Sequence, residues 1–372
     1  MNPAMGGRGR IRKNIVSAQE GGSDGHQIAA SAACVGIRSA GLGGRPRVLA
    51  SWLADKGEGG PHGPVTVTRL GLGCTNATWL VTDQARRQWV LRERINPDPR
   101  SFDREATLLT RLRAAGRPVP QVVGYGQQRG RHFMVLRFVP GVVLDDEIQA
   151  SRLNAAQRRR LGESIIDTLA GLHTVDPRVI GLPVFGSSHL DRQIAAVSDV
   201  WMSFGTSSVH DSAWCALRTR LLARRPMRES RVGGVVHGDY RLANIVTRED
   251  AQVRTVVDWE RCTAGNPLMD LAWLLNSWRA PGEPIGCPLS PTRIGGFSSR
   301  EELAGFYADR TDIDLHEVTF YRALAYWTSA TLLQAAETRR RADASRQLLG
   351  SVDEEITFSL IEAASLLRRP TW

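Results

Sequence analysis

Apolar and polar residues alternate with a period of two in five short segments of the first part of the chain. This period is typical of strands that bury one face, because successive side chains in a strand point to opposite sides. The five predicted strands are Val65–Leu70, Thr78–Thr82, Gln88–Glu93, Val122–Tyr125 and His132–Phe138. A helix is predicted over Asp103–Ala115, where leucines recur on one face. Together these elements predict a small antiparallel sheet with one helix beside it.

From Asn154 onward the pattern changes to apolar residues spaced three and four apart, which is the spacing of amphipathic helices. Leu161, Ile165, Leu169 and Leu172 begin this pattern. Further helices are predicted over Asp191–Phe204, Asp211–Leu222, Leu303–Tyr307 and Leu315–Arg339. The sequence therefore predicts an α+β fold, with a small five-stranded sheet lobe followed by a larger, mainly helical lobe.

Composition divides the chain into three stretches. Residues 1–47 are rich in Gly, Ala, Ser and Arg without a sustained period, which predicts a disordered tail, although a mis-assigned start codon explains this stretch equally well. Residues 48–138 form the predicted sheet lobe, which begins with the amphipathic segment Val48–Leu53. A Pro-Gly break follows, so the helical lobe is predicted over residues 139–372.

Several aromatic residues and one histidine in the helical part have two interpretations, core or site. Trp201, Trp214 and His173 are most simply core or helix-end residues. The aromatic flank of the last predicted helix is also predicted as core, because such stripes pack inward more often than they line clefts. It comprises Tyr321, Leu324, Tyr326, Trp327 and Leu332. A wall of an acceptor site is the alternative.

The chemistry-bearing part of the chain runs from Val235 to Leu275, where two β-branched runs each lead into an acidic loop. Asp239, in the first loop, stands five residues before Asn244, and Asp258 ends the second run. Either acid alone is more often a turn residue or a solvated strand end. The joint pattern H-G-D-x₄-N, then D-W-E, then G-N-P-x-x-D indicates a nucleotide-dependent phosphotransfer site.

Phosphoryl transfer needs one carboxylate that orients the attacking hydroxyl and accepts its proton, and oxygen ligands for Mg²⁺. Asp239 fits the first requirement, and Asn244 with Asp258 fits the second. Mg²⁺ usually takes one or two protein carboxylates and completes its shell with phosphate oxygens and waters. These few ligands are therefore enough for a magnesium site.

The same segment resembles the aminoglycoside phosphotransferase and choline kinase superfamily, the small-molecule relatives of protein kinases. It is most similar to the bacterial branch related to the kinase-like domain of some acyl-CoA dehydrogenases. The resemblance implies a two-lobed protein-kinase-like fold. It also implies that Asp239 is the base and that Asn244 and Asp258 hold magnesium. Glu260 matches the second acid of the branch's D-W-E and is predicted as a further metal residue. Asp270 matches an aspartate that braces the catalytic loop, and His237 is implied to be structural. The specific part of the likeness is confined to residues 235–275.

A glycine-rich turn between the first two predicted strands is a candidate phosphate loop. Gly71, Gly73, Thr75 and Asn76 belong to it, and glycines let backbone N–H groups approach phosphates without hindrance from a Cβ atom. Two glycines in a hairpin are by themselves more often only a turn. Position in the chain, ahead of the H-G-D motif, favours the nucleotide interpretation.

Arg92 occupies the strand position where kinases carry a lysine that touches the phosphates. Its predicted partner is Glu105, on the helix that follows, and a pair of unrelated surface residues is the alternative. Arginine keeps the charge but changes reach and geometry, so catalytic rate is in more doubt than nucleotide binding. The resemblance also implies a hinge at Arg137, Phe138 and Val139, whose backbone groups meet adenine.

The formal net charge is +10, carried by 46 arginines and two lysines against 38 acids. A basic chain is typical of nucleic-acid or membrane partners, but no basic stripe with interleaved aromatics and no helix-turn-helix pattern accompanies this charge. Residues 51–141 carry +7 and residues 142–372 carry −2, so anionic ATP phosphates are a natural partner of the sheet lobe. We therefore expect no nucleic-acid or membrane partner.

Five cysteines at positions 34, 74, 215, 262 and 287 are odd in number and widely spaced. This spacing argues against a disulfide framework or a zinc site and indicates a reducing compartment, so a cytoplasmic location is expected. No apolar run approaches the roughly 18 residues that a membrane span needs.

The predicted function is ATP- or GTP-dependent, Mg²⁺-assisted phosphorylation of a small-molecule hydroxyl, with Asp239 as base. The sequence leaves the acceptor open between an aminoglycoside, a hydroxyacyl thioester of coenzyme A and other alcohols, and it leaves the oligomeric state open. A nucleotide-binding pseudoenzyme is the main alternative, supported by Arg92. A protein kinase fits less well, because D-W-E replaces D-F-G and no A-P-E follows.

Overall fold

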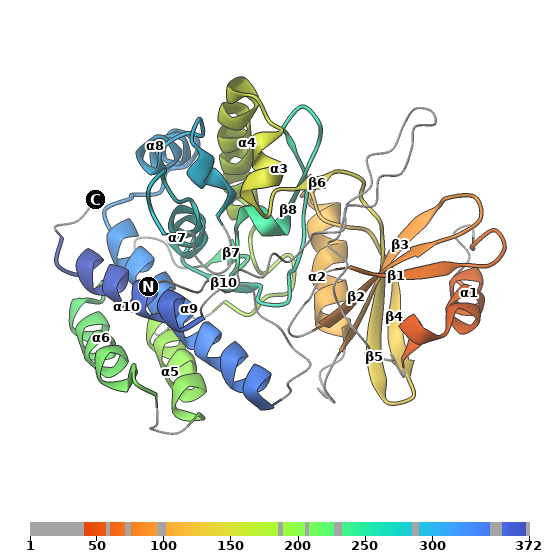
Figure 1. The fold of residues 1–372 in the computed structure, drawn as a ribbon, viewed down its shortest axis with the longest axis horizontal. Coiled ribbons are helices and arrows are strands. Elements are labelled where there is room, and N and C mark those ends of the chain that lie inside the picture. Colours follow the sequence, from red (N-terminus) through yellow and green to blue (C-terminus); the bar gives the residue numbers. More distant parts are fainter. Residues whose placement is uncertain are drawn as a thin grey trace, which may run out of the picture.

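The structure is a computed structural model that describes residues 41–56, 60–70, 76–94, 102–184, 189–204, 208–226, 233–284, 290–342 and 352–369; of residues 339–342 only the backbone is described. Gly71, Gly73 and Thr75 of the predicted phosphate loop lie outside the described residues, as does most of the predicted tail. Figure 1 shows a small lobe built on one sheet and a larger, mainly helical lobe beside it. The predicted α+β two-lobed fold is confirmed.

The small lobe is a five-stranded antiparallel sheet in the order β1-β2-β3-β5-β4. Its strands are β1 Thr66–Leu70, β2 Asn76–Thr82, β3 Gln88–Arg94, β4 Val122–Gln128 and β5 Arg131–Arg137. The predicted strands are all present, but β2 begins two residues earlier and β4 continues three residues further than predicted. The longer β4 pairs with β5 up to a tight turn at Arg129 and Gly130, both with positive φ.

The two faces of this sheet are covered by different elements. Helix α1, Pro46–Ala54, packs on one face over Trp89 and Leu91, and α2, Asp103–Ala114, lies on the face toward the large lobe (Figure 1). Because side chains alternate along β3, Arg92 points to the α2 side while Glu93 points to the α1 side. The period that predicts the strand therefore also directs the arginine toward the large lobe.

The short segment before α1 is fixed to the sheet by the buried Glu93 carboxylate. Leu42 N–H donates to Glu93 Oε1 at 2.5 Å and Gly43 N–H donates to Oε2 at 3.1 Å. Leu42 is only 1% exposed, inside the 3₁₀ turn η1, Leu42–Gly44. The predicted tail, residues 1–47, overlaps this packed segment, because composition does not reveal that a single leucine finds a buried place.

A pair of N-terminal deletions tests this attachment. Removing residues 1–40 should leave the melting temperature within about 2 °C of the full chain, since their composition cannot bury a core. Removing residues 1–47 should lower it by about 5–10 °C, because the Leu42 burial is lost and Glu93 loses its two donors. Differential scanning calorimetry of both proteins measures this difference, and equal melting temperatures would show that Leu42 contributes nothing.

The large lobe is built mainly from helices. Their bounds are α3 Glu147–Ser151, α4 Ala155–His173, α5 His189–Met202, α6 Asp211–Arg224, α7 Leu268–Ser277, α8 Arg300–Arg310, α9 Val318–Ala342 and α10 Val352–Leu366. A further 3₁₀ turn, η3, spans Pro291–Ile294. Asn154 begins α4 through a capping box with Gln157, which explains why the helical pattern starts there. Helix α10 has no counterpart among the predicted helices.

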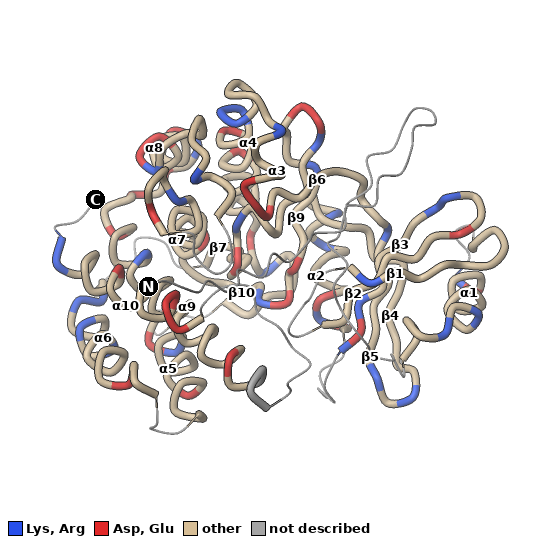
Figure 2. The backbone as a smooth tube through the Cα atoms, viewed as in Figure 1, with Lys and Arg blue, Asp and Glu red and all other residues tan. Residues whose placement is uncertain are grey.

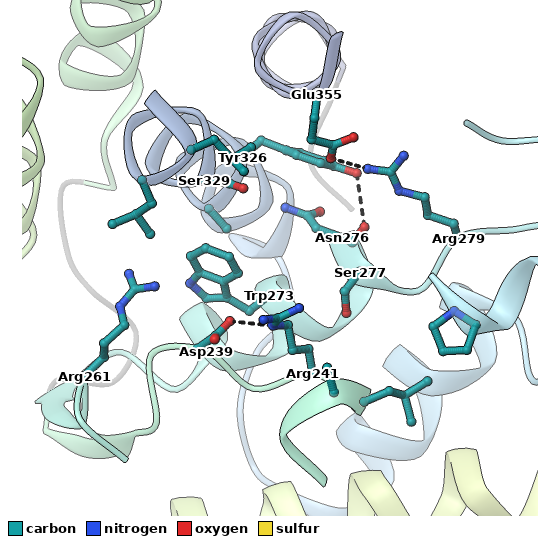
Figure 3. Close-up of a pocket in the computed structure, with 16 residues that line it drawn as sticks. Asp239, Arg241, Arg261, Trp273, Asn276, Ser277, Arg279, Tyr326, Ser329 and Glu355 are labelled. Atoms are coloured by element: carbon teal, nitrogen blue, oxygen red, sulfur yellow. Dashed lines mark hydrogen bonds and ion pairs between the residues drawn. The ribbon is translucent and has the colours of Figure 1, made fainter. Parts of the chain in front are cut away.

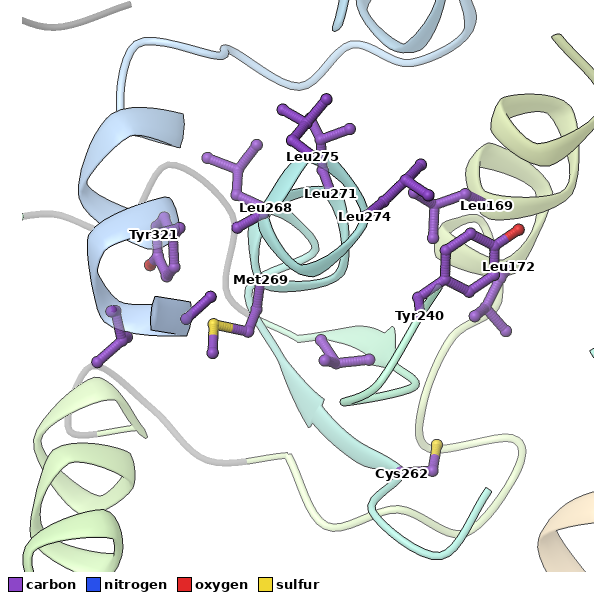
Figure 4. Close-up of a cluster of buried hydrophobic side chains, with 14 of the residues drawn as sticks. Leu169, Leu172, Tyr240, Cys262, Leu268, Met269, Leu271, Leu274, Leu275 and Tyr321 are labelled. Carbon is purple, nitrogen blue, oxygen red and sulfur yellow. The ribbon is translucent and has the colours of Figure 1, made fainter. Parts of the chain in front are cut away.

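Helix α7 is a buried helix of the large lobe, and Figure 4 shows its side chains between Tyr321 on one side and Leu169 and Leu172 on the other. Leu268, Leu271, Leu274 and Leu275 are each fully buried, and the helix packs against α9 and α8. Helix α9 in turn contacts α5, α6 and α10. This buried helix supports the loop that bears the predicted catalytic residues.

Aromatic residues fill the space between α5, α6 and α9. Trp214 stacks on Trp201 at a centroid distance of 4.9 Å and on Trp327 at 4.6 Å. All three rings are buried, so the prediction that they belong to the core is confirmed. Tyr326 is also buried, and it lines a pocket beside the catalytic loop together with Leu332 from the same predicted flank. The core prediction is therefore confirmed for the aromatic residues of the flank, and the acceptor-site alternative stays a prediction.

Charge is distributed differently on the two lobes. Figure 2 shows Lys and Arg residues along the turns and the outer helix of the small lobe, whereas acidic and basic residues are interspersed over the large lobe. Within the described part of the chain, no helix combines the length and apolar character that crossing a membrane requires.

Candidate active site

Two small sheets hold the catalytic loop. Strand β7, Gly234–Val236, pairs with β10, Thr263–Gly265; β8, Ile245–Thr247, pairs with β6, Val142–Val143, and with β9, Val253–Val256. The loop that contains Asp239 runs from β7 through the 3₁₀ turn η2, Leu242–Asn244, into β8. Asp258 follows β9 after one residue. The first acidic loop therefore leads into β8, and the second follows β9, the strand that pairs with β8.

Gly238 has a backbone conformation that only glycine adopts without strain. Its φ is +83°, and a Cβ atom there would come within 2.9 Å of the Arg261 carbonyl oxygen. The glycine of the H-G-D motif is thus required by the close approach of two loops. Its neighbour Asp239 is directed by this turn into the cleft.

Asp270 holds the backbone of the same turn. Its carboxylate accepts hydrogen bonds from the backbone N–H of His237 at 2.6 Å and of Gly238 at 2.8 Å. Asp270 has no exposed surface, and His173 Nε2 lies 3.4 Å from its Oδ2 atom. These are the contacts that the predicted brace requires. His173 itself is buried and bonded to Tyr307, in agreement with its predicted structural place.

A substitution at Asp270 tests the brace. Asp270→Asn keeps one acceptor oxygen but loses the charge, so we expect a destabilisation of about 2–3 kcal/mol and a melting temperature lower by about 5 °C or more. Asp309→Asn, on the exposed end of α8, is the matched control. Thermal denaturation followed by circular dichroism gives the result, and a shift of less than about 1 °C would contradict the brace.

His237 connects the catalytic loop to the second acidic loop. The Asp239 backbone N–H donates to His237 Nδ1 at 3.2 Å, and His237 Nε2 lies 3.0 Å from the Val257 carbonyl oxygen. An N–H group can only donate and a carbonyl can only accept, so the ring is neutral and carries its proton on Nε2. A histidine with both nitrogens engaged in this way positions the loop, which fits the structural place implied for it.

The Asp239 carboxylate is held by two side chains of its own loop. Arg241 Nε donates to Oδ1 at 3.0 Å, and Asn244 Nδ2 donates to Oδ2 at 2.9 Å. The same Asn244 nitrogen also donates to the Asp239 carbonyl at 2.8 Å. Asn244 thus explains the spacing of five residues, because the turn between them lets its amide reach both oxygens.

Asn244 and Asp258 lie on two loops that a backbone hydrogen bond joins. The Val257 N–H donates to the Asn244 carbonyl at 2.9 Å, which joins the two loops one residue before Asp258. Asp258 has a φ of +66°, a left-handed conformation that Asp and Asn tolerate better than most residues, and its side chain is 41% exposed. Both side-chain bonds of Asn244 use its amide nitrogen, so its Oδ1 stays available as an acceptor. An amide oxygen beside an exposed carboxylate is a donor set that Mg²⁺ prefers.

Arg92 lies within a cluster of three carboxylates. It pairs with Glu105, as the sequence predicts, and Nη2 lies 3.0 Å from Asp258 Oδ1 and 3.7 Å from Glu260 Oε2. Burial alone would lower the pKa of this guanidinium, but the three carboxylates raise it, so Arg92 is charged. The arginine therefore connects the small lobe directly to the candidate metal ligand.

Glu260 joins the lobes through Asn76, the first residue of β2. Asn76 Nδ2 donates to Glu260 Oε2 at 2.8 Å, and Asn76 Oδ1 accepts from Arg94 at 3.2 Å. Arg94 also lies 3.5 Å from Glu260. Asn76 is thus the one predicted phosphate-loop residue that the described structure places in the cleft. The metal role predicted for Glu260 stays a prediction.

The predicted hinge residues differ in their backbone partners. The Arg137 N–H donates to the Gln121 carbonyl at 2.8 Å and the Phe138 N–H to the Gln88 carbonyl at 3.3 Å, so both groups hold the sheet together. Within the described part of the chain, no backbone hydrogen bond of Val139 is present. Of the three, Val139 therefore keeps its N–H for a ligand.

A pocket of about 240 Å³ opens beside Asp239 between α7, α9 and α10. Figure 3 shows Asp239 at its edge with Arg241 and Arg261 on either side and Trp273 next to them. At the far end Arg279 Nη2 bonds Glu355 Oε1 of α10 at 2.5 Å. Apart from Asp239, the lining residues named here were not predicted from the sequence. Arg241 stands inside the motif region and could have been found, but Glu355 lies on the helix that the sequence pattern did not reveal.

A family model described as the phosphotransferase enzyme family matches residues 66–286 of this sequence. The chain belongs to this family. The matched residues run from β1 past α7 and include both acidic loops. The resemblance stated from the motifs is therefore confirmed.

Two curated members of the wider group illustrate the relationship. Acyl-CoA dehydrogenase family member 11 of Rattus norvegicus is 30% identical over 319 residues, covering 81% of this chain and 39% of the rat protein. Acyl-CoA dehydrogenase family member 10 of Mus musculus is 27% identical over 328 residues, covering 83% of this chain and 30% of the mouse protein. The chain thus spans at most about two fifths of the length of these relatives.

Solved phosphotransferase structures share the fold. A provisionally assigned aminoglycoside phosphotransferase from Ralstonia eutropha is 24% identical with a TM-score of 0.68, covering 86% of this chain and 96% of that one. The GDP and kanamycin complex of APH(2")-IIia is 18% identical with a TM-score of 0.58, covering 81% and 93%. At these identities the likeness shows the kinase-like fold.

Proposed function

We propose that this member of the phosphotransferase family transfers the γ-phosphoryl group of ATP or GTP to the hydroxyl of a small molecule. The observation that carries the proposal is the Asp239–Asn244–Asp258 arrangement. It presents an oriented carboxylate at the edge of a pocket and a pair of oxygen ligands next to it.

In the proposed reaction Asp239 is the base. The acceptor hydroxyl oxygen forms a bond to the γ-phosphorus while the bond from phosphorus to the bridging oxygen breaks. The hydroxyl proton passes to Asp239, and a nucleoside diphosphate leaves. Because the transition state of phosphoryl transfer is loose, little deprotonation is needed until late, so the main service of Asp239 is to orient the hydroxyl. Arg241 and Asn244 fix the carboxylate for this purpose.

Residues of both acidic loops fit a bound Mg²⁺. Asn244 Oδ1 and the Asp258 carboxylate would hold it, and Glu260 is the candidate second acid. When bound, the ion supplies charge neutralisation on the phosphate oxygens. Asp258 keeps 41% of its side chain exposed, so it can accept a ligand without uncovering a buried charge.

Nucleotide binding is assigned to the cleft between the lobes. Arg92 has the charge to contact phosphates and is already fixed by Glu105, while Val139 offers a backbone donor for the base. APH(2")-IIia is solved with GDP, and ATP and GTP are both carried as donors in this proposal.

One observation favours a second candidate, a nucleotide-binding pseudoenzyme. The Arg92 guanidinium donates directly to Asp258 at 3.0 Å, so it occupies an oxygen that magnesium would use. In an active enzyme, Asp258 must exchange its contact with Arg92 for a contact with the metal during each turnover. A pseudoenzyme needs no such exchange.

Radiolabelled ATP and GTP, each incubated with the protein, Mg²⁺ and a bacterial metabolite extract, separate these functions. Label in a small molecule supports the phosphotransferase, and label in protein alone indicates a protein kinase. Nucleotide binding by calorimetry without any labelled product supports the pseudoenzyme. Absence of both binding and product would end the proposed function.

A further inference from the structure

A second pocket, of about 290 Å³, adjoins the first on the other side of Arg261 and Trp273. It lies between the first turn of α5, the β7–β10 pair and α7. Arg261 and Trp273 line both pockets, with the guanidinium carbon 5.2 Å from the centre of the indole ring. Gly238 lines the second pocket while its neighbour Asp239 lines the first. One small molecule can therefore contact both.

The lining of the second pocket is basic. It contains the side chains of His189, Arg192 and Arg261, and none of the described residues that line it is acidic. Asp191, the acid between His189 and Arg192 in sequence, pairs with Arg225, whose Nη1 atom lies 3.2 Å from its Oδ1 atom. Gln193 and Thr263 add polar side chains that can donate hydrogen bonds. Two guanidinium groups and an imidazole around one cavity are suited to an oxyanion.

The imidazole has a fixed place in this wall. His189 Nε2 lies so close to Gly265 that a Cβ atom there would come within 2.7 Å of it. Burial and the charge of Arg192 both lower the pKa of His189. A bound anion would offset the lowering of the His189 pKa by the charge of Arg192.

We propose that this second pocket binds a carboxylate or phosphate group of the acceptor, whose hydroxyl lies at Asp239 in the first pocket. The proposal rests on the proposed phosphotransfer and narrows its acceptor to a hydroxylated anion. A polycation such as the kanamycin bound to APH(2")-IIia would meet like charges here. In this proposal the acceptor extends from the first pocket to the second across Arg261, with Trp273 beside it.

The pocket can be tested without a known acceptor by titrating the protein with inorganic phosphate and, separately, with acetate. Proton NMR follows the His189 ring signals, which a His189→Gln variant assigns among the eight histidines. Binding should raise the pKa of His189, so affinity should increase as the pH falls through that pKa. If only phosphate produces the shift, the acceptor carries a phosphate group. If acetate produces the shift as well, the pocket also accepts a carboxylate group.

Arg192→Gln should weaken phosphate binding about fivefold, because one charged donor is removed from an exposed position. Arg160→Gln, which removes the same charge from the exposed face of α4, is the matched control and should change nothing. The Arg192→Gln/Arg261→Gln double variant should abolish the His189 shift while the melting temperature stays close to that of the parent. No shift in the parent, or an unchanged shift in the double variant, would overturn the anion site.

Nucleotide affinity measured on the same variants separates this inference from the proposed function. Arg192→Gln should leave the Kd of ATP and GTP unchanged, since the second pocket lies outside the cleft between the lobes. A parent protein that binds phosphate at His189 but binds no nucleotide would end the phosphotransfer proposal and leave the anion site. A parent protein that binds nucleotide but binds no phosphate at His189 would leave the phosphotransfer proposal in place with a different acceptor.

Discussion

Asp239→Asn should reduce kcat by about 10²–10⁴, the usual contribution of a general base, while the nucleotide Kd changes by less than about threefold. The amide keeps the size of the side chain and one acceptor atom, so the hydroxyl still finds a partner. What is lost is the negative charge that receives the proton and that pairs with Arg241 at 3.0 Å. Asp239→Ala should be as slow or slower, because it also loses the orientation of the hydroxyl.

A purely structural Asp239 predicts a different pattern. Its bonds to Arg241 and Asn244 would then serve to hold the loop, so Asp239→Asn would melt at a lower temperature and keep most of its activity. Measuring kcat, nucleotide Kd and melting temperature on both variants decides the matter. Glu249→Gln, an exposed acid shortly after the same loop, is the control for loss of charge. A kcat within about threefold of the parent would end the catalytic assignment.

Asp258→Asn should lower turnover by at least about 10³ and remove the Mg²⁺ dependence of nucleotide binding, since losing the carboxylate forfeits several kcal/mol of charge stabilisation. Asparagine is the informative replacement here. The φ of +66° at this position strains most residues but suits Asn, so the backbone stays in place. Arg92 keeps Glu105 and Glu260 as partners, so the fold should persist.

Nucleotide Kd measured with and without Mg²⁺ gives the decisive comparison for Asp258. The parent should bind more tightly with the ion, and Asp258→Asn should bind equally in both conditions. Asp250→Asn, on the exposed turn before β9, should behave as the parent does. Near-normal turnover of Asp258→Asn would show that the metal, if any, is held elsewhere.

The strands and the motif loop could be predicted from the sequence because local rules govern them. Alternation along β3 fixes both its burial and the direction of Arg92. The spacing from Asp239 to Asn244 follows from a single hydrogen-bonded turn. The pairing of Arg92 with Glu105 could be predicted as well, because both lie on adjacent elements of the small lobe.

Features that depend on segments distant in sequence could not be predicted by these local rules. Leu42 finds its buried place only because Glu93 accepts its N–H, across 51 residues of sequence. Glu355 meets Arg279 across 76 residues, so the far wall of the first pocket depends on α10 and on the distant loop that follows α7. Nothing in the sequence distinguishes Arg261 from other charged residues, and its position between two pockets follows from the packing of β10 against β7.

The bridge from Asn76 to Glu260 bears on how a spent nucleotide leaves. The lobes are connected covalently near Val139, and this bridge, with Arg94, joins them again beside the Arg92–Asp258 contact. Separation of the lobes must break these polar contacts, and product exit limits turnover in many enzymes. Contacts between charged groups weaken as ionic strength rises. The residence time of the diphosphate should therefore shorten with added salt, because the Arg94–Glu260 pair of this bridge weakens, and the asparagine at the start of β2 is one of the groups on which the escape of product depends.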